Sequence, residues 1–363
     1  MLFGHIELIK NIYGIPNLMH LSFYKNTNGH IGVILFFVLS GFLISYLLID
    51  ELNKQNKINF YLFYSKRVFR IWPIYYLMVL FAIIIFPYII FHFEGYFHKY
   101  SIYETLNYLF FLPNIAKSTH QFIPGAVHLW SIGVEEQFYL IWPILILVFR
   151  KNLNLLFLII FILFTLIPPA IDYINVHTSF FEKIPEIKKN ASSFFISFKI
   201  NAMALGALTA NLYYSNFKLI RFLYFRTIAY SILLFTFLFW MFGITFGTYN
   251  DEIYAILFSC IILELSTNPK PSIILENKII KFLGRISYGV YVYHWVIVVI
   301  IVLFIKKNII IESKNLLYIN ILIYLSSIFF TIAISHLSFR YLETPLIKFN
   351  KKKIGKQTNI IKQ

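Results

Sequence analysis

Long apolar runs recur along almost the whole chain, separated by short polar segments. A helix that crosses a bilayer needs about 20 mostly apolar residues. On this scale the hydropathy pattern predicts nine complete membrane-spanning helices, at residues 31–49, 71–93, 128–149, 152–171, 193–213, 222–245, 252–267, 286–305 and 316–338. Residues 1–8 resemble the last turns of a further span that is cut off at its start, which would make ten.

The pattern therefore predicts one all-α, polytopic integral membrane helical bundle of about ten transmembrane helices, the first one truncated. We expect the membrane domain to cover residues 1–345 and a basic cytoplasmic tail to cover residues 346–363. No polar stretch is long enough for a separate soluble domain. Within the run at 193–213, three small residues repeat at four-residue spacing and favour close packing of a neighbouring helix: Ala202, Gly206 and Ala210.

Composition agrees with a membrane protein, because 59% of the residues are hydrophobic and only 13% are charged. Soluble domains have about 45–50% and about 25%. The single cysteine, Cys260, excludes an intrachain disulfide and a cysteine-based zinc site. The sequence contains no Walker loop, dinucleotide-binding glycine motif, nucleophile elbow or His-Glu-x-x-His motif, so we expect no metal and no permanently bound cofactor.

The net charge of +16 is explained by basic cytoplasmic loops rather than by nucleic-acid binding, because no nucleic-acid-binding module accompanies it. If the loop at 50–70 is cytoplasmic, 21 of the 32 Lys and Arg residues lie inside. This asymmetry predicts a cytoplasmic C-terminus. The long loops at 10–30, 94–127 and 172–192 then lie outside.

Ionisable side chains in apolar segments are the candidates for chemistry, because each costs about 2.5–3.5 kcal/mol to insert. The alternatives are a histidine that hydrogen-bonds between helices and a lysine that reaches the membrane surface. Both interpretations stay open for each candidate. The candidates are His5, Glu135, Glu136, Lys199, His294 and His336.

The densest polar cluster lies at residues 128–143. If this stretch is helical, the spacings of three and four put His128, Ser131 and Glu135 on one face. An imidazole and a carboxylate in a low-dielectric site can shift each other's pKa towards neutrality, as a general base requires. The alternative is a polar strip that caps the helix near water.

Four blocks together resemble the acyltransferase-3 family of integral membrane O-acyltransferases. They are residues 29–44, residues 60–73, residues 130–143, and residues 283–295 followed by 339–345. The resemblance implies a ten-span enzyme that moves an acyl group, commonly acetyl, from cytoplasmic acyl-CoA to a hydroxyl of a cell-surface polysaccharide or glycolipid. It also implies a bacterial cytoplasmic (inner) membrane location.

The family pattern places an arginine eleven positions before an essential histidine. His5 matches that histidine, but the arginine would fall before Met1. Two explanations follow: the true start lies upstream, which we favour, or the chain is a truncated copy with impaired activity. Lys199 and Asn201 stand where the family usually has Arg and Asp, so an amide hydrogen bond would replace the ion pair there.

The resemblance also implies roles for individual residues. Arg67 and Arg70 match a cytoplasmic basic pair, which Lys66 extends, and such groups suit the phosphates of coenzyme A. The equal alternative is an ordinary positive-inside signal. Substrate-binding or supporting roles are expected for a further set: His128, Ser131, Lys199, Asn201, Tyr288 and His294.

The resulting hypothesis is acyl transfer through the membrane core. His5 acts as a general base for the acceptor hydroxyl or as a transient acyl carrier, while Glu135 orients a histidine or holds the acceptor. Delivery to the extracytoplasmic glycan is self-contained or uses a separate periplasmic partner. The rival classes are a secondary transporter or flippase and a non-catalytic membrane scaffold.

Overall fold

The structure is a computed structural model that describes residues 1–21, 29–97, 99–178, 185–310 and 315–360. These residues form helices and no strand. The N-terminal half contains α1 (Leu2–Ile12), α3 (His30–Gln55), α4 (Phe60–Leu80), the π-helix η1 (Phe81–Ile85), α5 (Phe86–Glu94), α6 (Ile102–Leu109), α7 (Pro113–Ser118), the 3₁₀-helix η2 (Pro124–Leu129), α8 (Trp130–Val148) and α9 (Leu153–His177).

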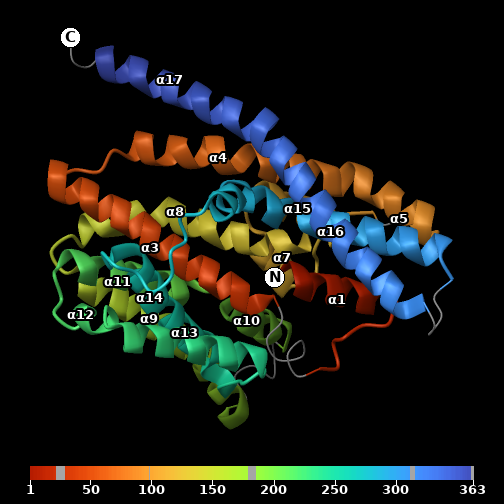
Figure 1. Cartoon of the computed structure of the whole chain (residues 1–363), viewed down its shortest axis with the longest axis horizontal. Coiled ribbons are helices and arrows are strands. Elements are labelled where there is room, and N and C mark those ends of the chain that lie inside the picture. The colour runs from red at the N-terminus through yellow and green to blue at the C-terminus, as the bar shows by residue number, and fades with distance from the viewer. Residues whose placement is uncertain (22–28, 98, 179–184, 311–314, 361–363) are drawn as a thin grey trace.

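The second half continues the helical bundle without interruption by another domain in the described residues. Its elements are α10 (Pro185–Ser197), α11 (Ile200–Tyr214), α12 (Ile220–Leu223), α13 (Arg226–Met241), the 3₁₀-helix η3 (Gly247–Tyr249), α14 (Asn250–Thr267), α15 (Lys278–Asn308), α16 (Leu316–Ser338), the π-helix η5 (Phe339–Glu343) and α17 (Thr344–Ile360). The predicted basic tail is helical as far as α17 extends, and α17 projects beyond the rest of the bundle (Figure 1).

Seven helical segments of the described chain are long and apolar enough to cross a membrane. The prediction of an all-α, multi-pass membrane protein is therefore confirmed, whereas a count of ten spans is not established. The runs at 222–245 and 252–267 form α13, which is shorter, and α14, which carries Asp251, Glu252 and Glu264. The run at 193–213 lies in one of the seven segments, Asn190–Tyr214, although α10 ends at Ser197 and α11 begins at Ile200 within it.

Helices α3 and α11 pack backbone against backbone, as the repeat of small residues predicts. A Cβ atom at Gly41 would lie 2.0 Å from the Met203 carbonyl oxygen, and one at Gly206 would lie 2.1 Å from the Val38 carbonyl oxygen. Both contacts are far inside van der Waals distance, so only glycine fits at these two crossings. Helices α9 and α14 also pack on α11, next to α3 in Figure 1.

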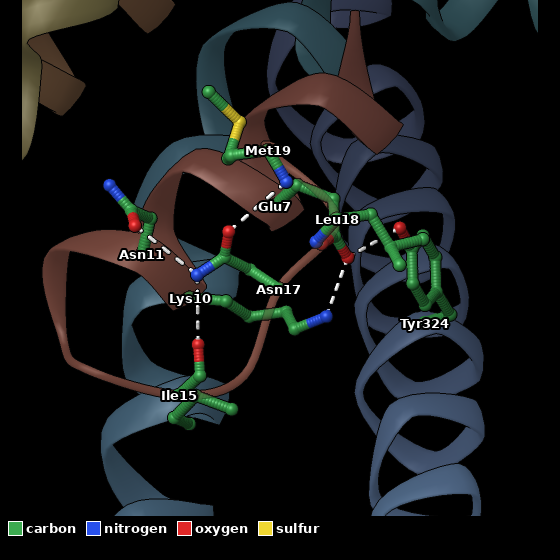
Figure 2. Close-up of polar contacts among 8 residues, drawn as sticks. All are labelled: Glu7, Lys10, Asn11, Ile15, Asn17, Leu18, Met19 and Tyr324. Atoms are coloured by element: carbon green, nitrogen blue, oxygen red, sulfur yellow. Dashed lines mark hydrogen bonds and ion pairs between the residues drawn. The ribbon is translucent and has the colours of Figure 1, made fainter. Parts of the chain in front are cut away.

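Helix α1 lies on the other side of the bundle, against α15 and α16 (Figure 1). Its buried Glu7 carboxylate accepts hydrogen bonds from Lys10 Nζ at 2.6 Å, from Tyr324 OH of α16 at 2.7 Å, and from the Leu18 backbone N–H. Figure 2 shows Lys10 and Tyr324 converging on this carboxylate. Because Glu7 and Lys10 are buried as a charged pair and Tyr324 reaches the carboxylate from α16, the cluster fixes α1, and with it His5, relative to α16.

Gly206→Ala should destabilise the bundle, because its methyl group would overlap the α3 backbone. Overpacking costs about 1–3 kcal/mol, and a backbone clash lies at or above the upper end. Gly284→Ala in α15 is the matched control, because nothing lies within 4 Å of the added Cβ. Thermal unfolding in detergent should show a lower Tm for Gly206→Ala only. Equal Tm values would contradict the close α3–α11 crossing.

Candidate active site

Three histidines from distant parts of the chain meet inside the bundle. His5 comes from α1, His128 from η2 and His294 from α15. The rings of His5 and His294 stack with their centroids 4.9 Å apart, and the His128 ring meets His294 edge-on at 5.2 Å. Sequence reasoning selected all three separately, and the structure brings them together.

The hydrogen bonds assign the proton positions of His5 and His294. His294 Nδ1 lies 2.6 Å from the Tyr291 carbonyl oxygen, which can only accept, so Nδ1 carries the hydrogen. In the neutral ring, His294 Nε2 then accepts from His5 Nδ1 at 2.6 Å. His5 Nε2 is consequently the nitrogen with a lone pair available for chemistry.

His128 is held in the same way by a backbone carbonyl of α15. Its Nε2 donates to the Val292 carbonyl oxygen at 2.8 Å. Its Nδ1, which then carries the lone pair, is buried and has no hydrogen-bond partner within the described residues. The Tyr291 hydroxyl donates to the His128 carbonyl oxygen at 2.6 Å and also hydrogen-bonds Ser131, so the predicted Ser131 supports this corner through Tyr291.

A cavity of about 170 Å³ opens beside these rings. Its lining includes His5, His128, Tyr291, Trp130, His30 and Lys117. Sequence reasoning missed Lys117, because it lies on the short helix α7 outside any apolar run. Its Nζ lies 3.7 Å from the centre of the Trp130 ring. Burial, with a smaller contribution from the charge of Lys199, lowers the pKa of Lys117 to about 8.

The break between α10 and α11 places Lys199 next to an acidic partner from α14. Lys199 Nζ lies 2.8 Å from Asp251 Oδ2, and His30 Nε2 lies 2.8 Å from the same oxygen. Asn201 donates to Glu252 at 2.8 Å. The expectation that an amide hydrogen bond replaces the ion pair here is therefore wrong. Asp251, fifty residues downstream, supplies the carboxylate that position 201 lacks.

Glu135 lies on α8 but points towards α3. Its Oε1 accepts from Ser40 Oγ at 2.5 Å, and the Tyr139 hydroxyl donates to Ser40 at 3.2 Å. Glu135 makes no hydrogen bond to His5, His128 or His294, whose hydrogen bonds lead elsewhere. The structure thus places Glu135 beside Ser40, and its role in holding an acceptor or orienting a histidine stays a prediction.

A second cavity, of about 160 Å³, lies at the α4–α8 contact and is lined by Arg67, Trp72, Glu136 and Tyr139 among others. The Arg67 guanidinium lies 5.5 Å from the Tyr139 ring centre, and its buried Nε has no hydrogen-bond partner among the described residues. Trp72 Nε1 donates to Glu136 at 2.8 Å.

The other two members of the predicted basic cluster, Lys66 and Arg70, are exposed and do not line this cavity. The hydroxyl of the predicted residue Tyr288 donates to the Ile71 carbonyl oxygen at 2.9 Å. This hydrogen bond joins α15 to α4 directly after the basic cluster. One helix, α15, therefore carries both a contact to the Arg67 region and His294 of the first cavity.

Comparison with known proteins identifies the family of the chain. The family described as "Acyltransferase domain" matches residues 1–340, and the chain belongs to this acyltransferase-3 family. A Staphylococcus aureus protein named O-acetyltransferase OatA is 24% identical over 348 residues, covering 91% of this chain and 55% of that protein. A Listeria monocytogenes protein named peptidoglycan O-acetyltransferase OatA is 35% identical over 137 residues, covering 36% of this chain and 22% of that protein.

The chain thus spans about half the length of the Staphylococcus aureus relative and about a fifth of the Listeria monocytogenes relative. No solved structure matches the chain. Family membership and the multi-pass membrane fold are established by these comparisons together with the helices. The histidines and the arginine cavity described above lie within the matched residues.

Asp251→Asn should destabilise the protein, because it leaves the nearly buried Lys199 ammonium without its carboxylate. Breaking a buried ion pair costs about 3 kcal/mol or more. Asp50→Asn is the matched control, because Lys54 lies at the same 2.8 Å from Asp50 but is exposed. Thermal unfolding should show a lower Tm for Asp251→Asn and no change for Asp50→Asn. A similar Tm for the two variants would refute the structural importance of the buried pair.

Proposed function

We propose that the chain is a membrane O-acetyltransferase that moves an acetyl group from cytoplasmic acetyl-CoA to a hydroxyl of an extracytoplasmic cell-wall glycan. The observation that carries this proposal is the hydrogen-bonded series from the Tyr291 carbonyl through His294 to His5, which leaves a basic nitrogen beside a cavity. The names of the two relatives support acetyl as the group and a cell-wall polymer as the acceptor.

The chemistry needs only a base and an activated donor. His5 Nε2 takes the proton of the acceptor hydroxyl while the hydroxyl oxygen attacks the thioester carbonyl carbon. A carbon–oxygen bond forms, the carbon–sulfur bond breaks, and the thiolate leaves and later takes up a proton. His294 keeps His5 in the correct tautomer, because its Nε2 accepts the hydrogen of His5 Nδ1.

The donor is assigned to the Arg67 cavity. Arginine suits phosphate groups, and Arg67 has an unsatisfied donor atom there. Along α15, six residues separate Tyr288, which contacts α4 beside this cavity, from His294. At 1.5 Å per residue this is about 9 Å. This is the rise along α15 between the two residues, and in this proposal the thioester arm of the donor extends along it towards the histidine cavity.

The orientation proposed here follows the basic residues. With 21 of 32 Lys and Arg residues on one side, the loop at 50–70 and the C-terminus face the cytoplasm. The Arg67 cavity then lies towards the cytoplasm and the histidine cavity lies deeper. This arrangement fits an enzyme of the bacterial cytoplasmic membrane that takes its donor from inside, and a separate periplasmic protein is a further proposed recipient of the acetyl group.

His5→Asn tests the base. The Asn side chain can still donate a hydrogen bond to His294 but has no basic nitrogen, so acetylation should fall by about 10²–10⁴-fold. His177→Ala, at an exposed histidine of α9, is the matched control. Mass spectrometry of glycan O-acetyl groups in a deletion strain that expresses each variant gives the readout. Retention of acetylation by His5→Asn within tenfold would sink the assignment.

A measurement on the wild-type protein and the His5→Asn variant separates direct transfer from a covalent acyl-enzyme intermediate. Incubation with acetyl-CoA in the absence of acceptor should leave no acetyl group on His5 in intact-protein mass spectra if His5 acts only as a base. An acetyl adduct on wild type that disappears in His5→Asn would replace the base by an acyl carrier.

Arg67→Met should raise the KM for acetyl-CoA about tenfold or more, because a charge-assisted hydrogen bond to phosphate contributes about 1.5–3 kcal/mol. S-acetyl-pantetheine, which lacks the phosphates, should be used equally well by wild type and variant. Lys57→Met, at an exposed residue just before α4, is the control. An equal defect with both donors would show that Arg67 supports the fold rather than the phosphates.

A further inference from the structure

The mechanism above leaves one charged residue of the histidine cavity without a task. Helix α7 carries Lys117 into the lining of the cavity that His5 and His128 also line. The ammonium lies against the face of Trp130, with Nζ 3.7 Å from the ring centre. Contact with an aromatic face attracts a cation but does not neutralise it.

The charges around Lys117 do not balance. Its neighbour Lys199 is paired with Asp251, which also binds His30. Lys117 Nζ has no ion pair and no hydrogen bond to any residue in the described part of the chain, so the cavity carries one surplus positive charge. The other lysine near His5 differs in this respect, because Lys10 is paired with Glu7 at 2.6 Å.

We propose that Lys117 is a catalytic residue whose ammonium stabilises the oxyanion formed on the acyl carbonyl during acetyl transfer. This inference rests on the proposed function. As the acceptor oxygen bonds to the carbonyl carbon, the electron pair of the C=O bond moves onto its oxygen. That pair returns when the carbon–sulfur bond breaks. Lys117 keeps its proton throughout, while the hydroxyl proton goes to His5.

The placement suits this task. His5, the base, and Lys117, the cation, line the same cavity from different elements, α1 and α7, and we assign the acyl carbonyl to this cavity. A donor fixed in a low-dielectric site before the reaction stabilises developing charge far more than it would in water. Removal of one such donor typically lowers kcat by about 10²–10³-fold. The uncharged Trp130 ring holds the ammonium in place and does not compete with the oxyanion for it.

The protonation of Lys117 adds a second consequence. Burial lowers its pKa to about 8, so the ammonium is present below that pH and is lost as the pH rises through it. The titratable groups that face it are His5, His30 and His128, together with the Lys199–Asp251 pair. Activity should therefore fall above about pH 8.

Purified full-length protein, acetyl-CoA and a soluble glycan oligomer serve to test the proposal with three variants. Lys117→Met removes the charge and keeps the length of the side chain, and Lys117→Arg keeps the charge. Lys99→Met changes an exposed lysine between α5 and α6. We expect Lys117→Met to lower kcat by about 10²–10³-fold with KM and Tm unchanged. Lys117→Arg should retain activity and move the alkaline limb to higher pH. Lys99→Met should match wild type.

The outcomes are distinct. A kcat of Lys117→Met within fivefold of wild type overturns the oxyanion role, while His5→Asn still reports on the proposed function. If Lys117→Met fails to fold, the pH profile of Lys117→Arg decides, because an unmoved alkaline limb overturns the proposal. If wild type transfers no acetyl group to any hydroxyl, the proposed function itself fails.

Discussion

The arrangement of the site depends on how α1 is attached to the bundle. This helix has only eleven residues, and its polar face is held by the Glu7 carboxylate, which binds Lys10 and Tyr324. A charged side chain buried in a membrane protein is costly unless it is paired, so the Glu7 carboxylate depends on these partners. Glu7 lies two residues from His5, so the contact that satisfies the carboxylate also sets the position of the proposed base against His294.

Much of the fold could be predicted from the sequence, because a bilayer requires each spanning helix to be a long apolar run. Each apolar run of sufficient length appears as a helix, and the small residues at Gly206 and its neighbours mark the α3–α11 crossing. The interruption at residues 198–199 could not be predicted from hydropathy. The averaged pattern there stays apolar, while the break depends on a partner, Asp251, from a different helix.

The candidate site was predictable only in part, and for a physical reason. The high cost of ionisable groups in hydrocarbon marked His5 and His294, but no local pattern reveals that residues 289 positions apart form a hydrogen bond. Lys117 was not predicted because it lies outside the apolar runs. Tyr291 was not predicted because tyrosine is common at membrane interfaces. The spacing that grouped His128 with Glu135 was less informative, because the 3₁₀ turn of η2 precedes α8 and turns His128 towards α15.

Both cavities are lined by buried polar atoms that have no hydrogen-bond partner in the described residues. Several buried hydroxyls of α16, such as those of Ser327 and Thr331, also lack partners in the described residues, but they are neutral and line neither cavity. The orphaned atoms that do line them belong to ionisable groups: His128 Nδ1 in one cavity, and Arg67 Nε and Glu136 Oε1 in the other. A neutral hydroxyl is cheaper to leave unsatisfied than a guanidinium or an imidazole. Other buried ionisable atoms of the described residues, such as Glu343 Oε1 and His336 Nδ1, also lack partners, but they line neither cavity. What distinguishes His128 Nδ1 and Arg67 Nε is the adjoining space, in which a thioester or its acceptor would supply the missing partner.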